Sequence, residues 1–127
     1  MVLSGDLHNG WFTSLTTRAG EKVGVEFTTP SVTATGFEGV GLAGLGSSLD
    51  GSALVPQLGA AAVGAGLGLI GDLNCADTVR RGYVMMTVTA AAVKGEYVHV
   101  STVKSTTYTA AVGKTVTVAA AGSVTIA

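Results

Sequence analysis

Two neighbouring stretches alternate apolar and polar residues, and this pattern constrains the fold more than any other feature. In residues 83–89, Val84 and Met86 fall on one face, and residues 96–103 alternate in the same way. A period of two residues is typical of a half-buried β-strand. Residues 90–95 between them have the length of a hairpin loop. The pattern therefore predicts a β-hairpin.

The remaining apolar residues are mostly small or β-branched. Aromatic residues make up only 6% of the chain and charged residues 12%, about half the usual quarter. A core of such side chains favours strands over helices. We expect further strands at residues 2–3, 23–27, 112–117 and 123–126, whereas residues 11–17 fit either a short helix or a strand.

Glycine and alanine dominate residues 39–72. A helix over residues 53–63 fits the apolar spacing there, but each glycine weakens a helix by nearly ~1 kcal/mol relative to alanine. The length of 127 residues indicates one domain. Composition and pattern divide that domain into three parts. These are a sheet segment (1–38), a loose helical insertion (39–72), and a β-hairpin with closing strands (73–127). The predicted fold class is α+β, mostly β, with one loose covering helix.

Charge and hydropathy exclude several function classes. The net charge is −1, and only Arg80 and Arg81 are adjacent basic residues, so we expect no nucleic-acid partner and no anionic membrane surface. The apolar residues 58–71 are too short for a membrane span of roughly 20 residues, and the first residues lack a signal-peptide pattern. Cys75 is alone, which excludes an internal disulfide and fits a small core residue.

Asp6 and His8 form the best local cluster of metal-ligating residues. They directly follow a strand-like run, and in an extended backbone side chains two positions apart point the same way. A carboxylate oxygen and an imidazole nitrogen can then meet at one metal ion, with Gly5 allowing close approach of the backbone. The Asp-x-His spacing alone is a weak signal, since it occurs often by chance.

Three segments, in this order, resemble consecutive blocks of the PhoD-like alkaline phosphatases, a branch of the metallophosphoesterases. They are Gly5-Asp6-Leu7-His8-Asn9-Gly10-Trp11, Val25-Glu26-Phe27-Thr28-Thr29-Pro30-Ser31-Val32-Thr33 and Asp77-Thr78-Val79-Arg80-Arg81-Gly82-Tyr83. The first resembles the last metal-binding motif of that family. Each block alone is weakly specific, but three in the right order over most of the chain are specific together.

The resemblance implies the C-terminal portion of a larger two-sheet sandwich flanked by helices. It implies a cluster of iron and calcium that hydrolyses phosphate esters, with Asp6 and His8 as two of its ligands. The other ligands would come from earlier motifs in the remainder of the phosphatase chain, which this sequence lacks. Two ligands cannot build a catalytic metal site, so we expect the chain alone to be inactive. The resemblance also implies a periplasmic or secreted location.

Three further residues are candidates for roles around the metal site. Glu26 matches an acidic position of the family and can orient a ligand, or it makes a structural hydrogen bond. Trp11 can wall the substrate pocket or anchor the core. Asn9 can contact phosphate, although an Asn-Gly turn explains it equally well. His99 fits a surface or core histidine.

One departure from the family lies before the Arg-Gly-Tyr segment. Residues 70–72 read Ile-Gly-Asp where the family commonly carries an Asn-Pro-His-like stretch. If that stretch shapes the pocket, this chain has an altered substrate preference.

An alternative hypothesis is a non-catalytic, β-rich module that binds a partner or forms homo-oligomers through exposed strand edges. A third is a small metal enzyme with a site shared across a dimer. Replacing Asp6 with alanine separates the phosphatase from the binding module, because only the phosphatase depends on that carboxylate.

Overall fold

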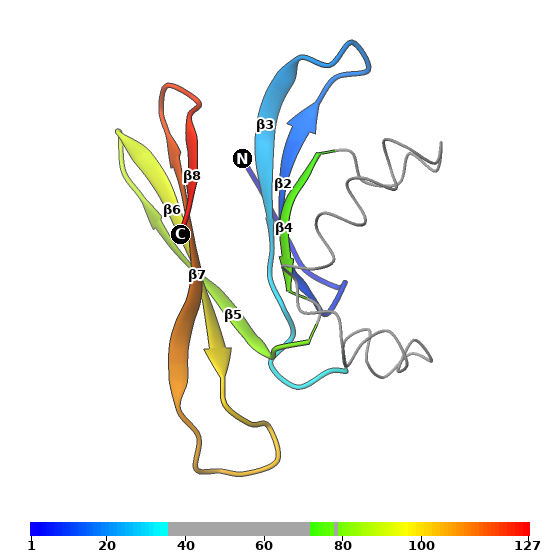
Figure 1. Ribbon diagram of the computed structural model, residues 1–127, viewed down its shortest axis with the longest axis vertical. Coiled ribbons are helices and arrows are strands. Elements are labelled where there is room, and N and C mark those ends of the chain that lie inside the picture. The colour runs from blue at the N-terminus through cyan, green and yellow to red at the C-terminus, as the bar shows by residue number, and fades with distance from the viewer. Residues whose placement is uncertain (36–71, 78) are drawn as a thin grey trace.

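The computed structural model describes residues 1–35, 72–77 and 79–127. These residues form two four-stranded sheets that stack as the layers of a β-sandwich (Figure 1). The two-sheet prediction is therefore confirmed, and the described residues contain no helix. The helix expected over residues 53–63 lies outside the described residues, as does nearly all of the predicted insertion.

The first sheet has the strand order β1-β3-β2-β4. Its strands are β1 (Val2–Ser4), β2 (Gly10–Thr16), β3 (Lys22–Thr28) and β4 (Leu73–Asp77). β1 runs parallel to β3, and the other pairs are antiparallel. Residues 11–17 thus lie mainly in a strand, because β2 is the central partner of both β3 and β4. The sequence pattern did not predict β4.

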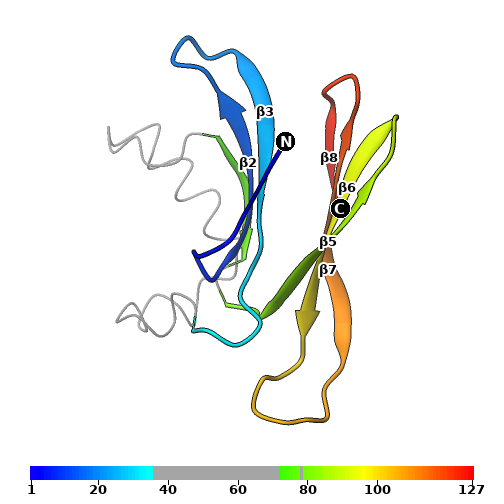
Figure 2. The same ribbon diagram turned by 180° about the vertical axis from the view of Figure 1, so that it is seen from behind.

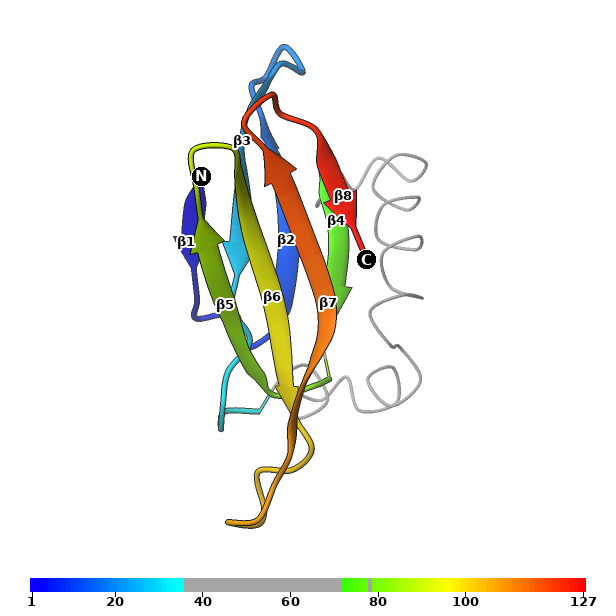
Figure 3. The ribbon, with the colours of Figure 1, turned by 90° about the vertical axis from the view of Figure 1, so that its left-hand side faces the viewer.

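The second sheet is an antiparallel meander of β5 (Gly82–Val88), β6 (Ala92–Val100), β7 (Ala110–Ala119) and β8 (Val124–Ile126). Figure 3 shows it lying in front of the first sheet. The predicted hairpin is confirmed as β5–β6. The predicted 90–95 loop is wrong, because the Thr89 amide donates to the Ala92 carbonyl and closes the turn at once. β6 also ends at Val100 rather than at residue 103.

The core lies between the sheets and contains most of the large side chains. Phe12 of β2 and Phe27 of β3 are fully buried, and their ring centroids are 4.8 Å apart at an interplanar angle of 56°. Such tilted aromatic pairs are favourable beyond the area they bury. The Phe27 ring lies over Gly95 of β6, where a Cβ atom would be only 2.4 Å from it. This contact explains why a glycine occupies the middle of a long strand.

Two further residues complete the core, and one of them links the sheets by a hydrogen bond. The buried Tyr97 of β6 donates its hydroxyl hydrogen to the backbone carbonyl of Trp11 in β2. Cys75 of β4 packs in the same cluster, as the sequence predicted, and burial raises the pKa of its thiol. A thiol of this kind packs as an apolar side chain and stays protonated.

Candidate functional site

Residues 5–9 connect β1 to β2 and carry both predicted metal ligands. The Leu7 amide donates to the Gly5 carbonyl at 2.9 Å, so the chain reverses over a three-residue turn centred on Asp6. Asp6 has φ = 71° and His8 has φ = 60°, and no other non-glycine residue described here has a positive φ. A positive φ is uncommon for residues other than glycine, although Asp and His adopt it more readily than most, and it costs conformational energy. The prediction of an extended backbone at Asp6 and His8 is therefore wrong.

The imidazole of His8 is held by the backbone. Its Nδ1 lies 2.9 Å from the carbonyl oxygen of Thr35, which can only accept a hydrogen bond. Nδ1 therefore carries the proton in the neutral ring, and the lone pair resides on Nε2. A metal-ligating histidine commonly has this arrangement, with its second nitrogen bonded to a carbonyl group. The His8 side chain is exposed, so Nε2 is accessible.

Asn9 stabilises the same loop through a side-chain hydrogen bond. Its side chain is fully buried, and its Nδ2 donates to the Leu7 carbonyl at 2.6 Å. Its Oδ1 has no hydrogen-bond partner among the described residues. Asn9 thus fixes the peptide that lies between Asp6 and His8.

Glu26 and Trp11 lie on the outer face of the first sheet. Phe12 and Phe27 point into the sandwich, so their neighbours Trp11 and Glu26 point away from it. Both side chains are half-buried, and Trp11 is outside the core cluster. No described residue bonds to the Glu26 carboxylate, so the structural hydrogen-bond alternative has no partner in this part of the chain.

The described residues hold no group of three or more metal-ligating side chains. The structure therefore does not bring Glu26 together with Asp6 and His8 as a third ligand. The carboxylate and the oriented imidazole fit two positions of a metal site, and further ligands are needed to complete it.

A second polar cluster, at the start of β5 and the end of β6, was not predicted from the sequence. The Asp77 carboxylate accepts hydrogen bonds from the Val79 and Arg80 amides and from the Arg80 guanidinium. His99 lies opposite, with its Nε2 3.6 Å from an Asp77 oxygen. Burial alone would raise the pKa of Asp77, but these hydrogen bonds and the Arg80 charge lower it below its ordinary value.

His99 is only 7% exposed, so its imidazole is buried. A bulge in β7 accommodates the ring, since a Cβ at Gly113 would lie 2.4 Å from His99 and 2.7 Å from the Arg80 guanidinium. Burial and the charge of Arg80 lower the pKa of His99, and they outweigh the Asp77 carboxylate and a hydrogen bond with the Arg81 backbone, which would raise it. His99 is therefore a neutral histidine held between the sheets.

We predict that this histidine makes the fold acid-sensitive. The pKa of His99 is lower in the folded chain than in the unfolded chain, where it is near 6.5, so the unfolded state takes up the proton first. The free energy of unfolding should fall as the pH drops below about 6.5, by at most about 1.4 kcal/mol per pH unit. Thermal unfolding between pH 8 and pH 5 measures this effect.

The variant His99→Leu should lose the dependence in this pH window, whereas His8→Gln, which keeps His99, should retain it. Asp77 affects stability in a separate pH range. Its pKa is lowered in the folded chain, so the stability that its carboxylate contributes is lost only as the pH falls below about 4. An unchanged dependence in His99→Leu would show that another group is responsible.

No described residue belongs to a helix long and apolar enough to cross a membrane. A search of the curated proteins found no match to this chain.

Two other comparisons found matches, one to a family model and one to a solved structure. Residues 1–97 match the family model described as PhoD-like phosphatase. A solved structure titled "Structure of PhoD" superimposes with a TM-score of 0.67 at 18% sequence identity, covering 98% of this chain and 22% of that chain. The likeness therefore extends over both sheets, although the chain spans about a fifth of the length of that protein. The match over residues 1–97 shows that the chain belongs to the PhoD-like phosphatase family.

Proposed function

We propose that this chain contributes Asp6 and His8 to the metal centre of a phosphatase that hydrolyses phosphate esters. One observation carries the proposal: the two residues that match the family's ligands are the two non-glycine residues with positive φ in the described chain. Strained backbone persists only where the surrounding structure enforces it, and it concentrates at functional sites.

The family supports the same chemistry at a coarser level. PhoD-like phosphatases are metal-dependent and are typically secreted or periplasmic. We infer iron and calcium as the metals, as the family resemblance implies; a carboxylate is compatible with calcium and an imidazole with iron. The bound metals would polarise the phosphate group and activate water. Asp6 would bind through a carboxylate oxygen and His8 through Nε2, with Thr35 holding the ring in place.

Three neighbouring residues support these ligands in the proposal. Asn9 positions the loop through its hydrogen bond to Leu7. Glu26, on the central strand β3, faces outward without a described partner and can orient a ligand or a bound water. Trp11 would form an apolar wall beside the substrate.

Removing the Asn9 amide should loosen the ligand loop. In Asn9→Ala, the Leu7 carbonyl loses its buried donor, so the turn that holds the Leu7 amide should open more often. We expect hydrogen exchange of the Leu7 amide to accelerate by about tenfold, as for the loss of a hydrogen bond worth roughly 1.4 kcal/mol. The matched control Asn74→Ala removes an exposed amide from β4 and should leave Leu7 unchanged. Equal exchange rates at Leu7 in both variants would argue against a bracing role.

A second candidate function is a partner-binding or oligomerising module. It is favoured by β1, which lies at the edge of the first sheet with Val2 44% and Leu3 57% exposed (Figure 2). An exposed apolar edge strand recruits other chains. This function requires an oligomer that does not depend on Asp6 or His8, which sedimentation of the wild-type and Asp6→Ala chains can test.

The phosphatase proposal is tested in a hybrid enzyme. The chain would replace the corresponding last part of a PhoD-like phosphatase, so that the earlier ligands are present. We expect the hybrid to bind metal and to hydrolyse p-nitrophenyl phosphate esters, and the 127-residue chain alone to do neither. A folded hybrid without metal or activity would refute the proposal.

A further inference from the structure

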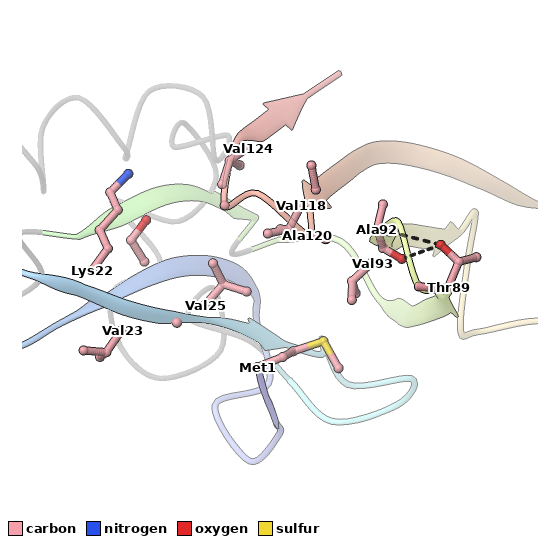
Figure 4. Close-up of a pocket in the computed structure, with 15 residues that line it drawn as sticks. Met1, Lys22, Val23, Val25, Thr89, Ala92, Val93, Val118, Ala120 and Val124 are labelled. Atoms are coloured by element: carbon pink, nitrogen blue, oxygen red, sulfur yellow. Dashed lines mark hydrogen bonds between the residues drawn. The ribbon is translucent and has the colours of Figure 1, made fainter.

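A second, apolar site lies between the sheets at the end of the sandwich farthest from the Asp6–His8 loop. It is a pocket of about 370 Å³, and it adjoins the first residues of β1 and β3, whereas the Asp6–His8 loop follows the last residues of β1. Figure 4 shows Val25, Val93, Val118 and Val124 on its walls, with Met1 at one side. Its size is within the roughly 300–1,000 Å³ range of small-molecule sites.

The pocket exists because the side chains at this end of the sandwich are short. The two layers of a sandwich lie about 10 Å apart, and Phe12, Phe27 and Tyr97 fill that distance in the core. Beyond Phe27 most of the inward residues are valines, with the buried Ser14 opposite Val25, and these side chains are too short to meet across the gap. Val25, Val93, Val118 and Val124 are accordingly only partly buried. Their methyl groups line an apolar space that the chain itself does not fill.

The wall formed by the second sheet is held in place by hydrogen bonds. Thr89 and Ala92 close the β5–β6 turn through both backbone and hydroxyl contacts, two of which are drawn in Figure 4. The Ala120 amide, in the β7–β8 turn, donates to the Ala91 carbonyl at 2.8 Å and ties the two turns together. The pocket is thus preformed, which lowers the cost of binding a ligand.

Lys22 supplies a cation to the pocket, whose lining also includes the polar residues Ser14 and Thr89. Its side chain is exposed at the rim, and it has no ion pair with any residue that the structure describes. A mainly apolar pocket with the Lys22 ammonium at its rim is complementary to an alkyl chain that ends in an anion. We propose that this pocket binds a medium-chain aliphatic carboxylate of about eight to ten carbons, a length suited to the lower part of the small-molecule size range. This site is independent of the proposed phosphatase function.

Titration of the isotope-labelled chain with decanoate tests the proposal. Valine methyl resonances of Val25, Val93, Val118 and Val124 should shift and saturate, while those of the outward-facing Val112 should not. Affinity should rise about fourfold for each methylene from hexanoate to octanoate to decanoate, as expected for burial of each group. Uniform shifts over both faces, or no shift at all, would overturn the proposal.

Variants separate the two parts of the ligand. Val93→Phe, or Val124→Phe if the first does not fold, should fill the pocket and weaken decanoate binding at least tenfold, whereas Val112→Phe on the outer face should not. Lys22→Gln should weaken decanoate about twofold to fivefold, the range of an exposed ion pair, and leave decanol unaffected. The control Lys104→Gln should change neither. A pocket closed by a second copy of the chain, seen as a dimer that excludes decanoate, would also overturn the proposal.

Discussion

Asp6→Ala should lower the phosphatase activity of the hybrid enzyme by more than about 100-fold. Loss of a residue that merely supports a metal ligand typically costs 10–100-fold in metal affinity or activity, and Asp6 is proposed to be a ligand itself. The substitution also removes a side chain that is exposed, so it takes nothing from the core. His8→Ala should have an effect of the same size. Hydrolysis of p-nitrophenyl phosphate at saturating metal measures both.

The control for this prediction is Glu21→Ala, which removes an exposed carboxylate from the β2–β3 turn and should keep full activity. Metal content is measured on the same samples, because a lost ligand should lower metal retention together with the rate. If Asp6→Ala retained both metal and activity, Asp6 would not be a ligand.

Phe27→Ala should destabilise the chain by about 3–5 kcal/mol, the range for large aromatic residues in cores. Phe27 is 1% exposed, packs on Phe12, and lies over Gly95 of the opposite sheet, so its loss empties the contact between the layers. Small domains are stable by only about 5–15 kcal/mol, so the midpoint of urea unfolding should drop sharply.

The matched control is Tyr83→Ala, since Tyr83 is 44% exposed on the outer face of β5. That substitution should change stability by less than about 1 kcal/mol. Equal urea midpoints for the two variants would mean that Phe27 does not hold the two sheets together.

The sandwich was predictable where a local pattern determines it. The alternation around Val84 and Met86 identified the hairpin, because one face of each strand packs against the core. β4 was missed because residues 73–77 are too short and too mixed to show a period. They form a strand only because β2 offers them a partner. The predicted loop extends too far along the chain, to residue 95, because glycine is typical of loops. Gly95 instead lies within β6, beneath the ring of Phe27.

The candidate site was predictable in its residues but not in its geometry. Asp6 and His8 were identified by their resemblance to a family motif. Their positive φ values could not be derived from a two-residue spacing, because they depend on the buried Asn9 and on the carbonyl of Thr35, 27 residues beyond His8.

No sequence pattern predicted the cluster around His99. It requires Asp77 from the other sheet and a bulge at Gly113, both of which are set by tertiary packing. The alternation of residues 96–103 puts Tyr97 and His99 on one face, and both are buried. It could not show that a carboxylate and a guanidinium lie opposite the imidazole.

The most direct test of the central claim is to locate the metal in crystals of the hybrid enzyme by anomalous diffraction. The account predicts a metal peak bonded to an Asp6 carboxylate oxygen and to Nε2 of His8, at about 2.0–2.6 Å. Metal bound elsewhere, with both side chains free of it, would contradict the assignment of this loop as a ligand motif.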